Sequence, residues 1–344
     1  MRNHQSKPLI AGDKIAITAP SSGVPESLQS QLDSAIENLR LRGFEVIEGS
    51  CLRREYKNCS ADRKLRAKEL MQFLCDPSIK AIMPPWGGEL AMEILDLLDF
   101  EVLKTVDAKW FSGFSDLSTL HVPLTTILGW RTLHGPNLME LAYSPLDTTT
   151  ATIWDILQSP AGTVIEQFSS GLYQDLSTNS FAEQKGYSLT EKTEWKLLNS
   201  SKKSINFSGI LIGGCLDTLG WLAGTKYADL PRFYEKNQDQ GVILYLENVE
   251  LAPCTLTRAL LSLKMKGWFD NIAGILLGRS AATKVIDSHL LTYEEALQNV
   301  FADLNIPILY DVDIGHIPPQ LSLVNGAYAE VFYDNGKGRL IQGL

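Results

Sequence analysis

Ser115, Glu247 and His316 are the residues of this sequence whose types and positions could together carry out acyl transfer. A serine hydroxyl needs a base to take its proton near neutral pH, and histidine is the usual base. The imidazole in turn needs a carboxylate that holds its tautomer and stabilises its charged form. Glu247 ends the apolar run 242–246, where a buried carboxylate is costly unless it is paired. The three residues therefore predict nucleophilic catalysis by a Ser-Glu-His triad.

The segment around Ser115 is predicted to be a strand, a tight turn and the first turn of a helix. Aromatic, strand-favouring residues precede the turn. An apolar stripe with helical spacing follows it at Leu117, Leu120, Leu124 and Leu128. A hydroxyl at the start of such a helix could attack a carbonyl while a neighbouring backbone N–H receives the oxyanion.

Each of these residues also has an ordinary structural interpretation. Ser115 or Asp116 could simply cap the helix, and Leu117 stands where the hydrolase motif Gly-x-Ser-x-Gly has its second glycine. Glu247 could be a solvated strand end. His316 could be a loop histidine with a structural partner, and spacing alone does not decide between His134 and His316 as the base.

The elements that must position these residues alternate between strands and helices over the first 130 or so residues. This alternation predicts βαβ units and a mostly parallel sheet. The loops at 21–23, 84–88 and 113–116 each follow a strand, so they should converge at the carboxyl edge of that sheet. The pattern weakens over 143–204, which we interpret as a crossover between domains, and a β-rich, mixed α/β region follows.

Composition excludes several other classes of function. The 344 residues carry 31 Lys and Arg against 40 Asp and Glu, a net charge of −9, which argues against nucleic-acid polymers and anionic membranes as partners. The five cysteines lack CxxC spacing, and no zinc motif is present, so we expect no metal, no cofactor and free thiols. The N-terminus lacks an apolar leader, and no apolar run reaches membrane-spanning length, so a cytoplasmic location is expected.

Several short motifs, taken together in their order, resemble those of the serine peptidases that include the LD-carboxypeptidases and the microcin C immunity carboxypeptidases. These motifs are Ile-Thr-Ala-Pro-Ser-Ser at 17–22, Pro-Pro-Trp-Gly-Gly-Glu-Leu-Ala at 84–91, Gly-Phe-Ser-Asp at 113–116, His-Gly-Pro-Asn at 134–137, Gly-Gly-Cys-Leu at 213–216, Leu-Glu-Asn at 246–248, Gly-Ile-Leu-Leu-Gly-Arg at 274–279 and Gly-His at 315–316.

The resemblance implies that Ser115 is the nucleophile, Glu247 the triad carboxylate and His316 the base. It implies an oxyanion hole made by the backbone N–H of Asp116 and one from Gly87 or Gly88. The implied fold is α/β, with a flavodoxin-like, parallel-sheet N-terminal domain and a swivelling, β-rich C-terminal α/β domain. We accordingly expect a nucleophile domain at 1–145, a linker at 146–204 and a second domain at 205–344, in a homodimer without a cofactor.

The sequence departs from the usual pattern of LD-carboxypeptidases at the glycine loop, and this departure affects which substrate we expect. Trp86-Gly-Gly-Glu89 stands where they usually carry Arg-Gly-Gly-Tyr, and this form resembles the microcin-immunity branch more closely. In that branch an aromatic residue of the inter-domain loop stacks on a nucleobase, which makes Trp195 a candidate platform beside the substrate-binding candidates Trp86 and Glu89. We therefore expect a peptidyl-nucleotide as the substrate. The alternative substrate is a murein tetrapeptide that loses D-Ala, and the non-enzymatic alternative is a small-molecule binding module.

Overall fold

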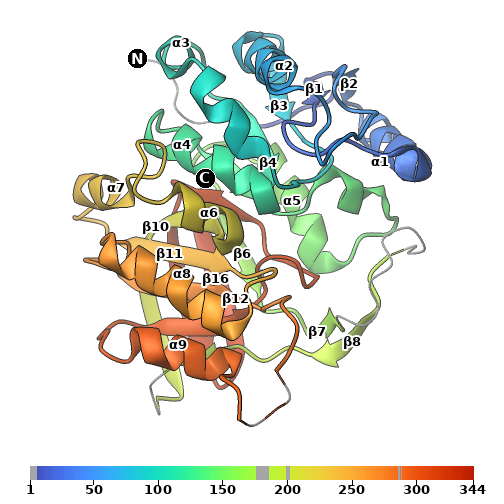
Figure 1. The fold of residues 1–344 in the computed structure, drawn as a ribbon. Helices are drawn as coiled ribbons and strands as arrows, with labels where there is room; N and C mark the ends of the chain where they lie inside the picture. Colours follow the sequence, from blue (N-terminus) through green and yellow to red (C-terminus); the bar gives the residue numbers. More distant parts are fainter. Residues whose placement is uncertain (1–5, 176–185, 199–201, 286, 288) are drawn as a thin grey trace.

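The computed structural model of the chain describes residues 6–175, 186–198, 202–285, 287 and 289–344. Two large β-sheets organise the molecule, one built mainly by the N-terminal half and one mainly by the C-terminal half (Figure 1). The predicted fold class, a parallel-sheet N-terminal domain followed by a second, β-rich α/β domain, is confirmed.

The first sheet has six strands in the order β14-β5-β4-β3-β1-β2. All neighbours are parallel except β14, which runs antiparallel to β5. Its strands are β1 (Lys14–Ile17), β2 (Glu45–Glu48), β3 (Ile79–Ile82), β4 (Trp110–Gly113), β5 (Thr132–His134) and β14 (Leu323–Asn325). Because parallel strands end at one edge, the loops after β1, β3 and β4 meet there, as predicted.

The second sheet has eight strands in the order β6-β16-β15-β10-β11-β12-β13-β9. The four strands β10 to β13 are parallel, and antiparallel strands flank them. The sheet consists of β6 (Val164–Phe168), β9 (Lys196–Leu197), β10 (Ser204–Cys215), β11 (Val242–Glu247), β12 (Gly274–Gly278), β13 (Ile308–Val312), β15 (Tyr328–Asp334) and β16 (Lys337–Gly343). A small hairpin of β7 (Leu172–Gln174) and β8 (Leu189–Lys192) stands apart.

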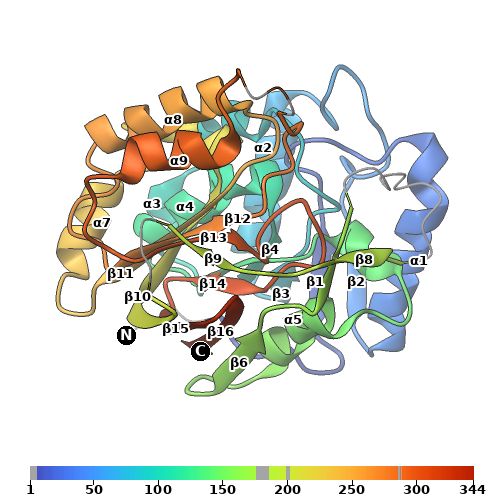
Figure 2. The same cartoon turned by 90° about the horizontal axis from the view of Figure 1, so that it is seen from below.

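Helices cover these sheets, and α8 and α9 lie on the same face of the second sheet (Figure 2). The α-helices are α1 (Gln29–Leu41), α2 (Arg63–Cys75), α3 (Phe100–Leu103), α4 (Ser118–Thr126), α5 (Thr148–Gln158), α6 (Leu216–Leu222), α7 (Leu230–Lys236), α8 (Pro253–Met265) and α9 (Tyr293–Phe301). The 3-10 helices are η1 (Glu26–Leu28), η2 (Ala91–Leu97), η3 (Ser115–Leu117) and η4 (Leu138–Ala142).

One predicted helix has a different winding from the one expected. The sequence predicts a helix over 89–98, and the structure has the 3-10 helix η2 there. Its tighter winding brings residues three apart onto one face, and Ala91 and Ile94 are both fully buried.

Two strands join a sheet that is otherwise built by the other half of the chain. Strand β14, from the C-terminal half, completes the first sheet against β5, and β6 pairs with β16 at the edge of the second. The predicted domain boundaries at residues 145 and 204 stay a prediction.

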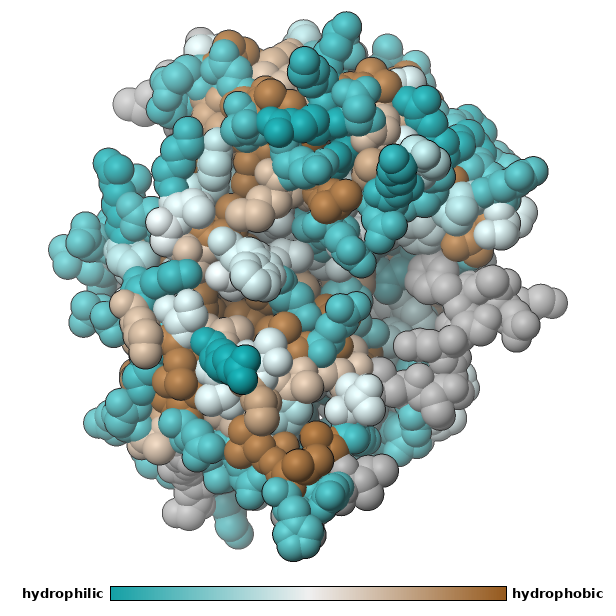
Figure 3. Space-filling view, in the orientation of Figure 1, coloured by the Kyte–Doolittle hydropathy of each residue, from teal (hydrophilic) through white to brown (hydrophobic). Residues whose placement is uncertain are grey.

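Hydrophilic side chains cover much of the face in Figure 3, with hydrophobic ones in separate patches. No helix within the described ranges is long and apolar enough to cross a bilayer.

Candidate active site

Ser115 lies at the sharp turn between β4 and α4, directly after Phe114. Its φ is +66°, a left-handed conformation that costs a non-glycine residue roughly 1–3 kcal/mol. Phe114, not Ser115, occupies the N-cap position of η3, and no side chain caps that helix. The serine hydroxyl is therefore held at a half-buried turn, and its partner is a histidine from the second half of the chain.

His316 joins Ser115 to Glu247. The His316 Nε2 lies 3.0 Å from Ser115 Oγ, and its Nδ1 lies 2.8 Å from Glu247 Oε2. Glu247, at the end of β11, has a fully buried side chain, whereas 23% of the His316 side chain is exposed. Gly315 has φ +93°, and a Cβ there would lie 2.5 Å from Glu247 Oε2. Only glycine therefore fits at this position, next to the Glu247 carboxylate. The structure thus brings the three predicted residues into one hydrogen-bonded chain.

His134, the competing histidine, is fully buried. Neither of its ring nitrogens has a partner among the described residues. Its ring packs edge-on against Phe114, with centroids 6.0 Å apart, and burial lowers its pKa well below the usual 6.5. His134 is therefore a neutral core residue, and the geometry selects His316.

The electrostatics of His316 result from two opposing effects. Burial lowers its pKa, but the charge of Glu247 and the hydrogen bond to it raise the pKa more, so it lies above the ordinary 6.5. The imidazolium that forms when a base accepts a proton is stabilised by such a carboxylate. Phe114 packs edge-on against the His316 ring, with centroids 4.7 Å apart, which helps to fix the ring.

The glycine loop after β3 lies directly against the turn that carries Ser115, the predicted nucleophile. A Cβ on Gly87 would be 2.8 Å from Ser115 Cβ and 2.7 Å from the backbone N of Asp116. Gly88 has φ +134°, and a Cβ there would be 2.5 Å from Ser21 Oγ. The close packing of Gly87, Gly88 and Asp116 around Ser115 is compatible with the predicted oxyanion hole.

Asp116 holds this arrangement together through its side chain. One oxygen accepts hydrogen bonds from Ser21 Oγ at 2.6 Å and from the Ala91 N–H at 2.8 Å, at the start of η2. Burial raises the pKa of Asp116, an effect that these hydrogen bonds oppose. Asp116 therefore caps η2, a helix distant in sequence, and so connects the nucleophile turn to the loops after β1 and β3.

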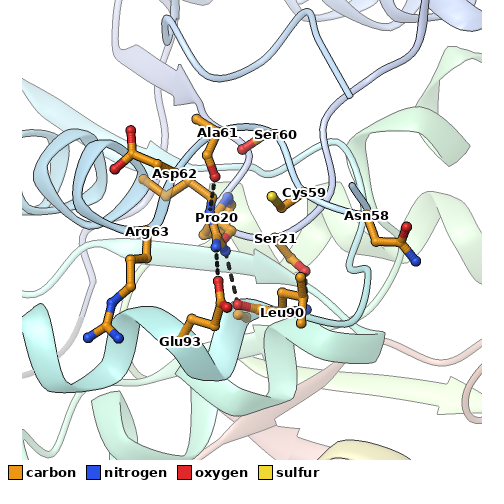
Figure 4. Close-up of polar contacts among 12 residues, drawn as sticks. Pro20, Ser21, Asn58, Cys59, Ser60, Ala61, Asp62, Arg63, Leu90 and Glu93 are labelled. Carbon is orange, nitrogen blue, oxygen red and sulfur yellow. Dashed lines mark hydrogen bonds and ion pairs between the residues drawn. The ribbon is translucent and has the colours of Figure 1, made fainter. Parts of the chain in front are cut away.

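Arg66, on α2, connects the same loops through its side chain, and Figure 4 shows its partners Pro20, Ala61, Leu90 and Glu93 close together. Its fully buried guanidinium donates to the carbonyls of Ala61, Pro20 and Leu90 at 2.8–2.9 Å. It also pairs with Glu93. Arg66 could not be recognised from the sequence, because a basic residue on a polar helix gives no sign that it is buried.

The predicted substrate-binding residues lie in three different environments. Trp86 is half-buried, and its indole N–H donates to the Ser22 carbonyl at 3.2 Å. Glu89 is exposed and lines a cleft of ≈ 260 Å³ together with Ser115. The substrate-binding roles of these two residues stay predictions.

The prediction that Trp195 is a stacking platform is wrong. Trp195 is fully buried within the core of the second sheet, and its indole N–H donates to Asp313 Oδ2 at 2.7 Å. Its ring fills the space over Gly338, where an added Cβ would lie 2.0 Å from the ring. The residue directly precedes β9, an edge strand of the sheet, so its side chain packs in the core instead of facing a ligand.

A buried carboxyl group near His316 was also not identified from the sequence. Glu140 accepts the Asn137 N–H at 2.7 Å and the Tyr187 hydroxyl at 3.0 Å, and burial raises its pKa to about 7. Asn137 in turn accepts the Phe114 N–H at 3.1 Å. The spacing of Asn137 and Glu140 is that of a capping box, which could have indicated this contact.

In the described part of the chain, no group of three His, Cys, Asp or Glu is arranged to hold a metal ion.

Comparison with known proteins gives matches to both halves of the chain. Residues 15–135 match the LD-carboxypeptidase N-terminal domain, and residues 208–331 match the LD-carboxypeptidase C-terminal domain. The microcin C7 self-immunity protein MccF of Escherichia coli is 26% identical over 95% of this chain and 93% of its own length. A protein of Bacillus subtilis named "Probable murein peptide carboxypeptidase" is also 26% identical, over 95% of this chain and 91% of its own.

Comparison of folds also finds MccF as a similar structure. The structure of MccF in complex with aspartyl sulfamoyl adenosine superimposes with a TM-score of 0.83. It covers 100% of this chain and 99% of the other, at 23% identity, a similarity that shows the shared fold.

Proposed function

The chain belongs to the LD-carboxypeptidase family of serine-type carboxypeptidases, and we propose that Ser115, His316 and Glu247 are its catalytic triad. The observation that carries the proposal is the continuous hydrogen-bonded chain from Ser115 Oγ through His316 to Glu247. A nucleophile and a base at 3.0 Å are within the range that proton transfer requires.

In the proposed reaction Ser115 Oγ attacks the scissile carbonyl carbon while His316 Nε2 accepts the hydroxyl proton. Glu247 holds the His316 Nδ1–H and stabilises the imidazolium. The oxyanion is received by the backbone N–H of Asp116 and one from Gly87 or Gly88. His316 then protonates the leaving group, which leaves an acyl-enzyme. Water, deprotonated by His316, attacks the acyl-enzyme and regenerates the Ser115 hydroxyl.

The substrate that we propose is a peptidyl-nucleotide or a related acyl conjugate. Support comes from MccF, which shares the fold along the whole chain and whose structure is solved with aspartyl sulfamoyl adenosine. The Trp86-Gly-Gly-Glu89 loop is a second, weaker argument for the same branch. The rival candidate is a murein tetrapeptide, because the B. subtilis relative named for murein peptides is as similar as MccF is.

A paired turnover assay by mass spectrometry tests this proposal. Wild-type protein and Ser115→Ala are each incubated with a peptidyl-nucleotide conjugate and with a murein tetrapeptide. The matched control is Ser34→Ala, because Ser34 is an exposed helix residue whose hydroxyl donates to the Ser30 carbonyl within α1. We expect cleavage of the conjugate by wild type and Ser34→Ala but not by Ser115→Ala. Release of D-Ala from the tetrapeptide instead would shift the substrate to murein peptides. Ligand binding without turnover by any variant would favour the binding-module alternative.

A further inference from the structure

The start of η4 is hydrogen-bonded to the turn that carries Ser115, a contact that the proposed reaction does not use. Asn137, the buried residue just before η4, accepts the Phe114 N–H through its side-chain oxygen at 3.1 Å. Gly113 faces the same oxygen, since a Cβ there would lie 2.6 Å from Asn137 Oδ1. Because Phe114 directly precedes Ser115, the Asn137 amide fixes the peptide that leads into the serine.

The first two residues of η4 bind the second wall of the same site. The Leu138 N–H donates to the Pro84 carbonyl at 3.3 Å, and the Met139 N–H donates to the Pro85 carbonyl at 3.1 Å. Both carbonyls belong to the glycine loop at 84–88, whose glycines pack against Ser115. A displacement of the start of η4 would therefore move both the serine turn and the glycine loop.

Glu140 fixes the start of η4 from within that helix. One of its oxygens accepts the Asn137 N–H at 2.7 Å, and the other accepts the Tyr187 hydroxyl at 3.0 Å. The Glu140 residue is only 7% exposed, and a buried N–H that loses its acceptor is costly. Glu140 therefore holds Asn137 where its side chain reaches Phe114.

Glu140 is also a source of negative charge for His316. Burial lowers the pKa of His316, Glu247 raises it most, and Glu140 and Asp217 raise it further. Burial raises the pKa of Glu140 to about 7, and Asp147 adds to this rise, whereas the hydrogen bonds and His316 oppose it. Above about pH 7 the Glu140 carboxylate is thus charged and favours the imidazolium. Burial keeps the other titratable neighbours uncharged, because it raises the pKa of the tyrosines and lowers that of the histidine: Tyr143, Tyr187 and His134.

We propose that Asn137 and Glu140 are positioning residues for the reaction at Ser115. Asn137 holds the turn that carries the serine, and Glu140 holds Asn137 and adds a second negative charge that acts on His316. The inference rests on the proposed function in one respect, namely that Ser115 is the nucleophile and His316 the base.

Steady-state kinetics at pH 8 compare wild type, Asn137→Ala and Asn38→Ala. The Asn38 amide, on α1, donates to the carbonyls of Leu141 and Ala142 at 2.9 and 3.2 Å, so Asn38→Ala loosens the other end of η4 and is the matched control. We expect Asn137→Ala to lower kcat by about 10²-fold with little change in KM, because a small misplacement of the reacting atoms costs that much. Asn38→Ala should keep kcat near the wild-type value, and an equal loss in both variants would overturn the inference.

Glu140→Gln separates the charge from the hydrogen bonds, because glutamine keeps an oxygen that can accept the Asn137 N–H. This variant should keep most of kcat at pH 8, and it keeps the test decisive if Asn137→Ala does not fold. Removing the negative charge disfavours the imidazolium, so the acidic limb of kcat/KM and the His316 pKa measured by NMR should both move to lower pH. A His316 pKa that stays in place would reject the electrostatic role of Glu140.

Hydrogen exchange of the Phe114 amide tests the positioning without turnover. In Asn137→Ala we expect this amide to exchange about tenfold faster, the factor that one hydrogen bond contributes, whereas Asn38→Ala should keep the wild-type rate. Faster exchange in a protein whose wild type cleaves no substrate would support the positioning and reject the triad proposal. Unchanged exchange in a protein whose wild type, but not Ser115→Ala, is active would support the triad proposal and reject the positioning.

Discussion

At the scale of the single residue, the protonation state of His316 should set the pH dependence of kcat/KM. Burial lowers its pKa, but Glu247 leaves it above 6.5, and a general base works only when deprotonated. We therefore expect kcat/KM to rise with pH through a pKa above 6.5. Glu247→Gln removes the negative charge that favours the imidazolium, so the acidic limb should move to lower pH and kcat should fall by about 10³–10⁴.

The measurement is a pH profile of kcat/KM for wild type, Glu247→Gln and Glu235→Gln. The control carries the same chemical change on an exposed position of α7 and should retain the wild-type limb. An acidic limb that stays in place in Glu247→Gln would show that another group sets it.

Ser115, Glu247 and His316 could be singled out from the sequence, and the structure places them within hydrogen-bonding distance of one another. Spacing alone could not decide between His134 and His316, because which loops meet depends on how the two sheets pack. The interpretation of Trp195 failed for a related reason. A tryptophan in a polar segment suggests an exposed position, yet Asp313 accepts its N–H and lets the ring enter the core.

At the scale of the element, the glycine loop gives a steric prediction. A Cβ on Gly87 would lie 2.7 Å from the Asp116 nitrogen, which is backbone and cannot move aside cheaply. We expect Gly87→Ala to displace the loop from the nucleophile turn and to lower kcat by about 10²-fold, the scale of losing one oxyanion donor. Steady-state kinetics and thermal unfolding measure the two effects separately.

The matched control is Gly220→Ala on α6, where an added Cβ meets nothing within 4 Å. Alanine is favoured over glycine inside a helix by roughly 0.5–1 kcal/mol, so this variant should keep its activity and gain slight stability. Full activity in Gly87→Ala would contradict the proposed role of the loop.

Most elements could be predicted from periodicity, including the strand before Ser115 and the helix after it. The supports of the loops could not, because they depend on buried polar contacts between residues distant in sequence. Arg66 and Asp116 connect the loops after β1 and β3 to α2 and η3. Nothing in their local sequence distinguishes them from solvated charges.

At the scale of the whole molecule, the sequence predicted two α/β regions but not their exchange of strands. β14 belongs by sequence to the second half and completes the sheet of the first. Its three residues match a strand pattern in either sheet, so only the packed structure assigns it. The proposed active site depends on this arrangement, since Ser115 comes from one half and Glu247 and His316 come from the other.

Asn325, the last residue of β14, makes the coupling between the two sheets testable. Its Oδ1 accepts the Gly213 N–H at 3.2 Å and the Tyr245 hydroxyl at 2.8 Å, both in the second sheet. Its Nδ2 donates to Thr132 Oγ1 at 3.2 Å in the first sheet. Asn325→Ala leaves these buried groups unsatisfied, so we expect the free energy of unfolding to fall by about 2–4 kcal/mol.

Urea unfolding followed by tryptophan fluorescence and far-UV circular dichroism measures this change. Because the contacts join both sheets, we expect the two probes to give one coincident transition in wild type and in Asn325→Ala. Gln298→Ala, an exposed change on α9, should shift stability by no more than about 0.5 kcal/mol. Two separate transitions in wild type would mean that the halves fold independently, and triad assembly would then depend on their docking instead of on a shared core.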